Sequence, residues 1–322
     1  MSPIAVAIVN YNTRDLLRDC LATVQAQAPH EVVVVDNGSI DGSVAMVQTE
    51  YPWVVLHASR TNLGYGAAAN RAISRCKSDY VLLLNADTRL QAEALEGLIT
   101  YLDLHPRAAV LGPRLVDTLG TGQISCHPFP TPLNTLLEIS ILGRLIRYVP
   151  VLRNHYLCTW PHTRPRIVPW VVGAALAIRR EAFMEIGGFD ESFFMYSEEV
   201  DLCYRLNSAG WQVHFAPVAR VVHVGGASTV QQRAEMNTEL FASILLFYRR
   251  HYSARRVAQL AFILKTVMLI RLVRDTLQLC LTRDGGRRAK ITEDMATWQK
   301  VLLGHRPKPV AAVDSKRIDI NA

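Results

Sequence analysis

The sequence lacks the features that mark secreted, zinc-finger and membrane-spanning proteins. Its six cysteines are scattered, with no CxxC pair and no metal-finger spacing, which favours a reduced, cytosolic protein. The N-terminal stretch "MSPIAVAIVNYN" has no basic lead, and its apolar run is too short for a signal peptide. A spanning helix needs about 20 apolar residues, and the apolar run from Val257 to Val273 is interrupted near its middle by Lys265. There is also no internal repeat.

The basic charge of the chain is concentrated near its C-terminus. The 322 residues, 50% hydrophobic and 20% charged, suffice for one large globular domain or two smaller ones. Residues 241–322 contain 16 Lys and Arg against 6 Asp and Glu, whereas residues 1–240 contain 19 against 22. A basic tail of this kind is compatible with a nucleic acid or with an anionic membrane surface as partner.

The first 111 residues alternate between strand and helix patterns. The predicted strands are 4–10, 31–36, 53–58, 80–85 and 108–111, and the predicted helices are 13–27, a weak helix from Asp41, 65–76 and 91–105. In the first of these helices one face carries Leu16, Leu17, Cys20, Leu21 and Val24, and Thr13 is a plausible N-cap. This alternation predicts an α/β fold with a mainly parallel sheet and helices on both of its faces.

The pattern changes after residue 112. Seven prolines between residues 113 and 166 predict loops and short helices. Later elements are a strand within 168–180, a helix over 197–210 that ends at Gly210, and two short strands at 211–216 and 220–224.

Two of the predicted strands end in an aspartate. "VVVVDNGS" leads to Asp36 and "LLLNADT" leads to Asp87. A single such residue is better explained as a turn residue or a helix cap, but two at the carboxyl edge of a parallel sheet favour a binding site. Asp87 offers an oxygen ligand for Mg²⁺ or Mn²⁺. Asp36 and Asn37 can hydrogen-bond a base or ribose, and Gly38 keeps the loop open to a close ligand.

Eight segments occur in the order and at the spacing of glycosyltransferase family 2. They are "IVNYNTRDLLRDCL", "VVVVDNGSIDGS", "NLGYGAAAN", "LLLNADT", "WVVGAALAIRREAF", "GGFDESFFMYSEEVDLCYRL", "GWQV" and "HVGGAST". Over about residues 4–230 the chain most resembles the rhamnosyltransferase-type branch of that family, which implies the GT-A fold. The signal is specific because all eight agree in order, while no single one would suffice.

The resemblance implies a nucleotide-sugar site with a divalent metal. Asp36 takes the position that recognises the donor's base, and Asp87 matches the last carboxylate of the DXD-like motif, here "NAD" where "NPD" is commoner. The metal, Mg²⁺ or Mn²⁺, is expected to bridge Asp87 and the donor diphosphate, with His223 beside it, although a lone histidine in an apolar strand is more often structural. The expected nucleotide-sugar-binding residues are Asn10, Asp36, Asn37, Gly38, Asn62, Gly64, Asn85 and Asp87.

For catalysis, the resemblance assigns the general base to Glu199 and the further acid of the "EDVD" motif to Asp201. The family usually has Asp where this chain has Glu199, and helical spacing groups Glu198 with Asp201 on another face. Glu198 therefore stays open as the base. Without the resemblance, acids in a first helical turn would be read as complementing the helix dipole. Trp170 and Gly173 are expected on the acceptor side, although a packed core tryptophan is nearly as common.

The reaction that the resemblance implies is a single displacement with inversion. The acceptor hydroxyl attacks the anomeric carbon opposite the leaving diphosphate, a base takes its proton, and the metal absorbs charge. The branch implies dTDP-rhamnose as the donor. It also implies a polyprenyl-diphosphate-linked or cell-wall glycan as the acceptor.

Three other classes of protein share parts of this pattern. "GYGAAA" (64–69) satisfies a dinucleotide fingerprint and suggests an NAD-dependent oxidoreductase, but "SRTNL" separates its glycines from the preceding strand. A processive polysaccharide synthase would carry a QxxRW motif, and "QQRAE" (231–235) lacks the tryptophan. A non-catalytic scaffold that binds sugar nucleotides does not explain the acids at 36, 87, 199 and 201.

The resemblance and the charge distribution together suggest a division of the chain. We expect a glycosyltransferase domain over 1–230, with a nucleotide-sugar-binding half (1–112) and an acceptor-binding half (113–230), followed by a basic amphipathic helical extension over 231–322. Residues 231–282 are expected either to lie on an anionic membrane surface or to pack on the catalytic domain, with equal support for both. Residues 283–322 look partly disordered. We expect a cytoplasmic protein, peripheral on the cytoplasmic membrane, with no nucleic-acid partner.

Overall fold

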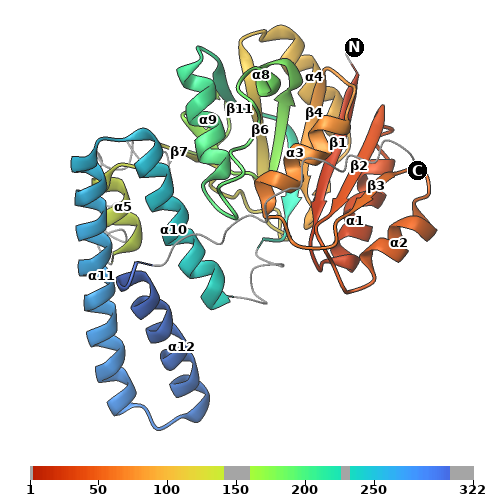
Figure 1. The fold of residues 1–322 in the computed structure, drawn as a ribbon. Coiled ribbons are helices and arrows are strands. Elements are labelled where there is room, and N and C mark those ends of the chain that lie inside the picture. Colours follow the sequence, from red (N-terminus) through yellow and green to blue (C-terminus); the bar gives the residue numbers. More distant parts are fainter. Residues whose placement is uncertain (1–2, 141–159, 226–232, 305–322) are drawn as a thin grey trace.

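The computed structural model describes residues 3–140, 160–225 and 233–304. Cys158, most of the "GGAST" segment, the start of "QQRAE" and residues 305–322 lie outside the described residues. Figure 1 shows an α/β part built on a central sheet, with a group of helices from the C-terminal part of the chain beside it.

The first half of the sheet consists of β1 (Ile4–Asn10), β2 (Glu31–Asp36), β3 (Val55–Ala58) and β4 (Tyr80–Asn85). These strands are parallel, in the order β3-β2-β1-β4. β1, β2 and β4 are apolar almost throughout because both faces of the sheet are covered. The register places Asn10 beside Asp36 and Val9 beside Asn85, so polar residues gather at one edge.

β10 (Ala175–Arg179) joins the two halves of the sheet, because it pairs antiparallel with both β4 and β6 (Ala108–Val116). β6 pairs in parallel with β11 (Gln212–His223). β11 also pairs antiparallel with β5 (Thr88–Leu90), the short strand that follows Asp87. The remaining short strands are β8 (Arg166–Ile167), which pairs with β11, and β7 (Cys126–His127) with β9 (Trp170–Val171), which form a separate pair.

Helices cover both faces of the sheet. One face carries α1 (Arg14–Gln25), α2 (Ser43–Glu50) and α4 (Ala94–Leu104), and the other carries α3 (Tyr65–Arg75), α8 (Arg180–Glu185) and α9 (Glu198–Ser208). Alternate residues of β1 enter the two cores, with Val6 and Ile8 in the first and Ala5 and Ala7 in the second. This division follows from the two-residue period of a strand.

A third core joins the C-terminal helices to the α/β part. Its helices are α5 (Pro132–Ile139), α10 (Arg233–His251), α11 (Ala254–Leu281) and α12 (Gly285–Leu302). Phe241 and Phe247 of α10 lie in one cluster with Phe193 and Val200 from the segment around the start of α9. No helix in the described part of the chain combines the length and the hydropathy needed to cross a bilayer.

A buried carboxylate anchors α10 to α9. Asp201 is 1% exposed, and its Oδ2 accepts a hydrogen bond from Arg205 Nε at 2.7 Å. Its Oδ1 lies 2.6 Å from His251 Nε2 at the end of α10. These two partners replace the water that the carboxylate loses on folding. Ser243 of α10 adds a second link, because its Oγ donates to the carbonyl oxygen of Met195 at 2.8 Å.

The predicted α/β fold, with a mainly parallel sheet flanked by helices, is confirmed. Within residues 4–105 the helices and strands lie within a few residues of their predicted bounds, because long apolar runs and helical periodicity are strong there. The short β5 was not predicted. With only three residues, it has no period of its own and is defined by its pairing with β11.

Several predictions after residue 105 were wrong in detail. The strand predicted near 108–111 continues to Val116. The strand character predicted over 168–180 is confirmed, since β9 and β10 both lie there. The two strands predicted at 211–216 and 220–224 are one strand, β11, with a break in register that absorbs Pro217. α12 lies in the region described as partly disordered. Its own pattern is weak, and burial of Ile291 and Trp298 stabilises it.

Asp201→Asn is expected to lower the free energy of unfolding by about 3 kcal/mol, because the partly buried guanidinium of Arg205 loses its counter-charge. Urea unfolding followed by circular dichroism measures this change. Asp19→Asn is the matched control. Its bridge to Arg89 is at the surface, with side chains 49% and 43% exposed, and such pairs contribute less than about 1 kcal/mol. Equal losses in the two variants would show that the link between α9 and α10 adds no special stability.

Candidate active site

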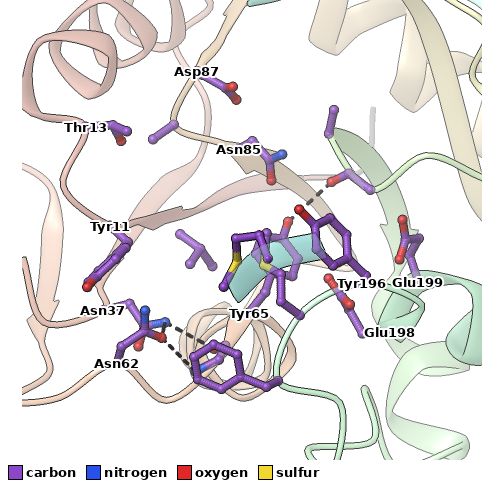
Figure 2. Close-up of a pocket in the computed structure, with 18 of the residues that line it drawn as sticks. Tyr11, Thr13, Asn37, Asn62, Tyr65, Asn85, Asp87, Tyr196, Glu198 and Glu199 are labelled. Carbon is purple, nitrogen blue, oxygen red and sulfur yellow. Dashed lines mark hydrogen bonds between the residues drawn. The ribbon is translucent and has the colours of Figure 1, made fainter. Parts of the chain in front are cut away.

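A pocket of about 430 Å³ opens where β1 and β4 end and where α3 and α9 begin. Figure 2 shows Asn37 and Asn62 on one side of it, Glu198 and Glu199 on the opposite side, and Asp87 at its rim. The predicted site residues that line the pocket are Asn37, Asn62, Gly64, Asn85, Asp87, Gly173, Glu198, Glu199 and His223. The fold therefore brings together residues that are more than 180 positions apart in the sequence.

Asn37 and Asn62 form a fixed pair of amides on one wall. Asn37 Nδ2 donates to Asn62 Oδ1 at 3.0 Å and to the carbonyl oxygen of Gly64 at 3.1 Å. Asn37 Oδ1 accepts from the backbone N–H of Leu63 at 2.9 Å. Gly64 is required next to this pair, since its φ is +83° and a Cβ there would lie 2.6 Å from the carbonyl oxygen of Phe194. This close approach holds the loop before α3 against the loop before α9.

Asn10, Asp36 and Gly38 lie behind that wall, outside the lining of the pocket. Asp36 is 1% exposed. Its Oδ2 accepts from Asn10 Nδ2 at 2.8 Å and its Oδ1 accepts from the backbone N–H of Ser39 at 2.8 Å. These bonds shape the loop that carries Asn37. The contact between Asp36 and the donor's base stays a prediction, and Asn37 is the neighbour of Asp36 that reaches the pocket.

The carboxylate and the imidazole predicted to hold a metal face each other, with Asp87 Oδ1 and His223 Nε2 3.7 Å apart. The ligands of one octahedral Mg²⁺ ion are about 3.0 Å apart when adjacent and about 4.2 Å apart when opposite, so the observed spacing lies within the range that one ion can span after a small side-chain movement. The pair offers oxygen and nitrogen donors, which suit Mg²⁺ or Mn²⁺ when phosphate oxygens complete the set. Among the described residues, no cluster of three or more His, Cys, Asp or Glu side chains forms a metal site on its own.

Three buried side-chain oxygens at the pocket have no hydrogen-bond partner: Asn85 Oδ1, Glu198 Oε2 and Glu199 Oε2. Buried polar atoms are as a rule hydrogen-bonded, and each unpaired one costs about 1–3 kcal/mol. All three belong to residues that line the same pocket. This arrangement is typical of a site whose missing partners come from a ligand.

Glu198 and Glu199 are the first two residues of α9, and a strained turn precedes them. Tyr196 and Ser197 have left-handed φ values of 67° and 65°, a conformation that costs non-glycine residues of the order of 1–3 kcal/mol each. Helical spacing groups Glu198 with Asp201 rather than with Glu199, but in the structure it is Glu198 and Glu199 that both line the pocket. Asp201 is the acid that lies outside the lining, where its carboxylate anchors α10.

Burial raises the pKa of both pocket carboxyls. Glu198 is 5% exposed, and its pKa lies well above the ordinary 4.5 because of burial and, second, because of the adjacent charge of Glu199. Burial also raises the pKa of Glu199, but the backbone N–H groups of Gly173 and Val200 oppose this increase. The two carboxyls titrate as a pair. The increase is larger for Glu198, which lacks the backbone donors that oppose it at Glu199 from Gly173 and Val200.

Of the two residues predicted on the acceptor side, Gly173 lines the pocket and Trp170 does not. A Cβ at Gly173 would lie 3.6 Å from Glu199 Cβ. Trp170 Nε1 donates to the carbonyl oxygen of Pro128 at 2.8 Å, and its ring stacks on His127 with centroids 4.7 Å apart. Trp170 therefore packs as a core residue, which was the alternative interpretation.

Some lining residues were missed from the sequence. They are Tyr11, Thr13, Tyr65, Tyr196 and Met236, among others. The first four lie inside the quoted segments, and their position there was an available signal. Met236 had none, since it lies on α10 and only the tertiary structure brings that helix to the pocket.

The "GYGAAA" segment does not have the geometry of a dinucleotide fingerprint. β3 ends at Ala58 and α3 begins at Tyr65, so a loop separates the strand from the glycines. The fingerprint requires its first glycine in the tight turn directly after the strand. The segment instead places Gly64 against the loop before α9.

Comparisons with known proteins agree with the motifs. The profile "Glycosyl transferase family 2" matches residues 5–187, and "Glycosyl transferase family group 2" matches residues 142–282. The N-acetylglucosaminyl-diphospho-decaprenol L-rhamnosyltransferase of Mycobacterium tuberculosis is 31% identical over 89% of this chain and 97% of its own length. Rhamnosyltransferase WbbL of Escherichia coli is 25% identical over 68% of this chain and 82% of its own length.

A solved structure supports the fold. Mannosyltransferase PcManGT from Pyrobaculum calidifontis, in complex with GDP-Man and Mn²⁺, matches with a TM-score of 0.55 at 16% identity, over 94% of this chain and 87% of that chain. At this identity the likeness concerns the fold, which is the predicted GT-A fold. With more than half of its length matched by the family profile, the chain belongs to glycosyltransferase family 2 and is a glycosyltransferase.

Proposed function

We propose that the chain transfers rhamnose from dTDP-rhamnose to a hydroxyl of a lipid-linked or cell-wall glycan, with inversion and with Mg²⁺ or Mn²⁺. The observation that carries this proposal is the meeting of three groups in one pocket: fixed amides, an oxygen and nitrogen donor pair, and two buried carboxylates. Rhamnose is favoured because the names of both the mycobacterial and the Escherichia coli relatives state rhamnosyl transfer.

The nucleotide half of the donor is assigned to the wall with Asn37 and Asn62, whose amides supply donors and acceptors for a base or ribose edge. Asp87 and His223 would hold the divalent ion between them and the diphosphate. When bound, the ion supplies positive charge that stabilises the departing diphosphate. Asn85 Oδ1 is buried in the same pocket and has no hydrogen-bond partner. In the proposed complex it accepts a hydrogen bond from the nucleotide sugar.

Glu199 is the general base of the proposed reaction. Backbone N–H groups of Gly173 and Val200 oppose the increase in its pKa, which favours the charged form that takes the proton from the acceptor hydroxyl. The new bond forms between the acceptor oxygen and the anomeric carbon while the bond to the diphosphate breaks on the opposite side. Glu198 keeps its proton and acts as a hydrogen-bond donor in the same pocket.

The acceptor side is proposed to take a lipid-linked glycan. The mycobacterial relative is named for a diphospho-decaprenol-linked N-acetylglucosamine acceptor. In this chain, apolar side chains of Val172, Met195 and Met236 line the same pocket as the two carboxylates. A lipid-linked acceptor implies work at the cytoplasmic face of a membrane, with the protein bound there peripherally.

Titration calorimetry with dTDP, UDP and GDP, each with and without Mn²⁺, tests the donor site. We expect Mn²⁺-dependent binding of dTDP, and a loss of at least about tenfold in Asp87→Ala because the metal loses a ligand. Asp79→Ala is the matched control, because Asp79 is exposed and immediately precedes β4, at the end of the strand away from the pocket. Tighter binding of UDP or GDP would show that the donor carries uracil or guanine instead of thymine. Binding that ignores both Mn²⁺ and Asp87→Ala would contradict the metal site.

Glu199→Gln is expected to lower kcat by about 10²–10⁴-fold with unchanged donor affinity, because glutamine keeps the shape but cannot take a proton. The wild-type rate should rise with pH, above the ordinary carboxyl pKa of 4.5, since the base acts only when deprotonated. Initial rates across pH, with NMR of the product anomer, measure both effects. Glu198→Gln is the comparison variant, and a larger kcat loss there would assign the base to Glu198.

A further inference from the structure

Within residues 3–140, 160–225 and 233–304, one face of α11 stays exposed along much of the helix. Its other face packs against α5, α10 and α12, with Leu260, Leu264, Val267 and Met268 buried. In Figure 1, α11 runs along the outer edge of the molecule, farther from the sheet than α10. The uncovered face therefore points away from the α/β part.

This uncovered face carries a continuous apolar stripe. Its members follow one another at intervals of one, three, four or seven residues, which places them on one side of a helix. The apolar stripe consists of Phe262, Leu269, Ile270, Val273, Leu277 and Leu281, with exposed fractions between 54% and 85%. At 1.5 Å per residue it is roughly 29 Å long. Contiguous exposed apolar surface of this kind marks a site of contact with a partner or a membrane.

Exposed basic residues, called the basic rim below, occur along α11 and at the start of α12. Between residues 254 and 290, eight Lys and Arg residues are exposed: Arg255, Arg256, Lys265, Arg274, Arg283, Arg287, Arg288 and Lys290. The two acids in this range offset only part of the charge of the eight basic residues, one of them by an ion pair with Arg274. Asp275 is 2% exposed and accepts hydrogen bonds from Arg274 and Trp298, and Asp284 caps the start of α12.

We propose that the apolar stripe docks on an anionic lipid surface, with its side chains at the acyl boundary and the basic rim on the headgroup phosphates. The charge of the rim selects this occupant. Two copies paired through the same face would bring two rims of equal sign together, which is unfavourable. The proposal rests on the proposed function in one respect, because a lipid-linked acceptor lies in such a surface.

Flotation of the purified chain with phospholipid vesicles tests the docking surface. We expect binding to phosphatidylcholine vesicles that contain phosphatidylglycerol, and weak binding to phosphatidylcholine alone. High salt should weaken the binding, because it screens the basic rim. Equal binding to both kinds of vesicle, or none to either, would overturn the proposal.

The double substitution Ile270→Glu and Leu277→Glu places two charges in the apolar stripe without touching the pocket. We expect a loss of vesicle binding of at least about tenfold, with an unchanged thermal unfolding temperature. Leu104→Glu is the matched control, because Leu104 is 72% exposed at the end of α4, outside the helices that carry the stripe and rim. Analytical ultracentrifugation that shows a wild-type dimer, dissociated by the double substitution, would assign the stripe to a second copy instead.

Transfer assays separate this proposal from the proposed function. The double variant should keep wild-type transfer to a water-soluble acceptor and lose transfer to a lipid-linked acceptor in vesicles. Vesicle binding without transfer to any acceptor would contradict the proposed function and still support the docking surface. Equal transfer by wild type and double variant to the acceptor in vesicles would remove the docking surface instead.

A second observation concerns Gln123, which contacts His223 and had no assigned role. Gln123 Nε2 donates to the backbone carbonyl oxygen of His223 at 2.9 Å, so its Oε1 is the atom that faces His223 Nδ1, at 3.0 Å. An amide oxygen only accepts, so Nδ1 carries the proton. His223 Nε2 is then left with its lone pair on the side of Asp87.

The geometry points to Gln123 as a positioning residue for the metal site. It fixes both the ring orientation and the tautomer in which Nε2 is free to bind an ion. Loss of such a supporting hydrogen bond lowers metal affinity by about 10–100-fold.

Gln123→Leu tests this role, with Gln123→Glu as the conservative variant, because a carboxylate also accepts from Nδ1–H. We expect Mn²⁺ affinity in the presence of dTDP to fall in Gln123→Leu and to be retained in Gln123→Glu. Nitrogen NMR shifts of His223 report the tautomer directly. Gln212→Leu is the control, because Gln212 faces His214 at 3.0 Å, outside the pocket. An unchanged tautomer and affinity in Gln123→Leu would overturn the assignment.

Discussion

β1 lies between β2 and β4, with a register that sets Asn10 beside Asp36 and Val9 beside Asn85, and the pocket depends on this parallel pairing. Parallel strands end on the same side, so three consecutive strand–helix units deliver their polar residues to one edge. β10 then enters antiparallel beside β4 and brings Gly173 and the start of α9 to the same edge. The two walls of the pocket are held together by the contact of Gly64 with Phe194.

The wall that carries Glu198 and Glu199 combines two features that cost free energy, buried carboxyls and a strained backbone turn. Glu198 and Glu199 are adjacent carboxyls that burial holds at raised pKa, and Tyr196 and Ser197 before them have left-handed backbone conformations. Such strain persists only where neighbouring structure overdetermines it. Asp201, in the same turn of α9, supplies part of that support through its contacts with Arg205 and His251.

The C-terminal helices therefore connect three features of the molecule. α10 contributes Met236 to the pocket and His251 to the anchor of α9, and its apolar residues share a core with the segment before that helix. α11 packs on α10 and turns the apolar stripe outwards. The apolar stripe on α11, which we assign to the membrane surface, is thus connected through α10 to α9, the helix that begins with Glu198 and Glu199.

The strand–helix alternation, the family and nine of the predicted site residues that line the pocket were readable from the sequence, because local periodicity and motif order carry them. Long-range contacts decided the rest. Helical spacing groups Glu198 with Asp201 and sets Glu199 on another face, whereas in the structure Glu198 and Glu199 both line the pocket and Asp201 does not. Gln123 and His223 are 100 positions apart, and Met236 reaches the pocket only because α10 folds back to it, and no local pattern encodes either contact.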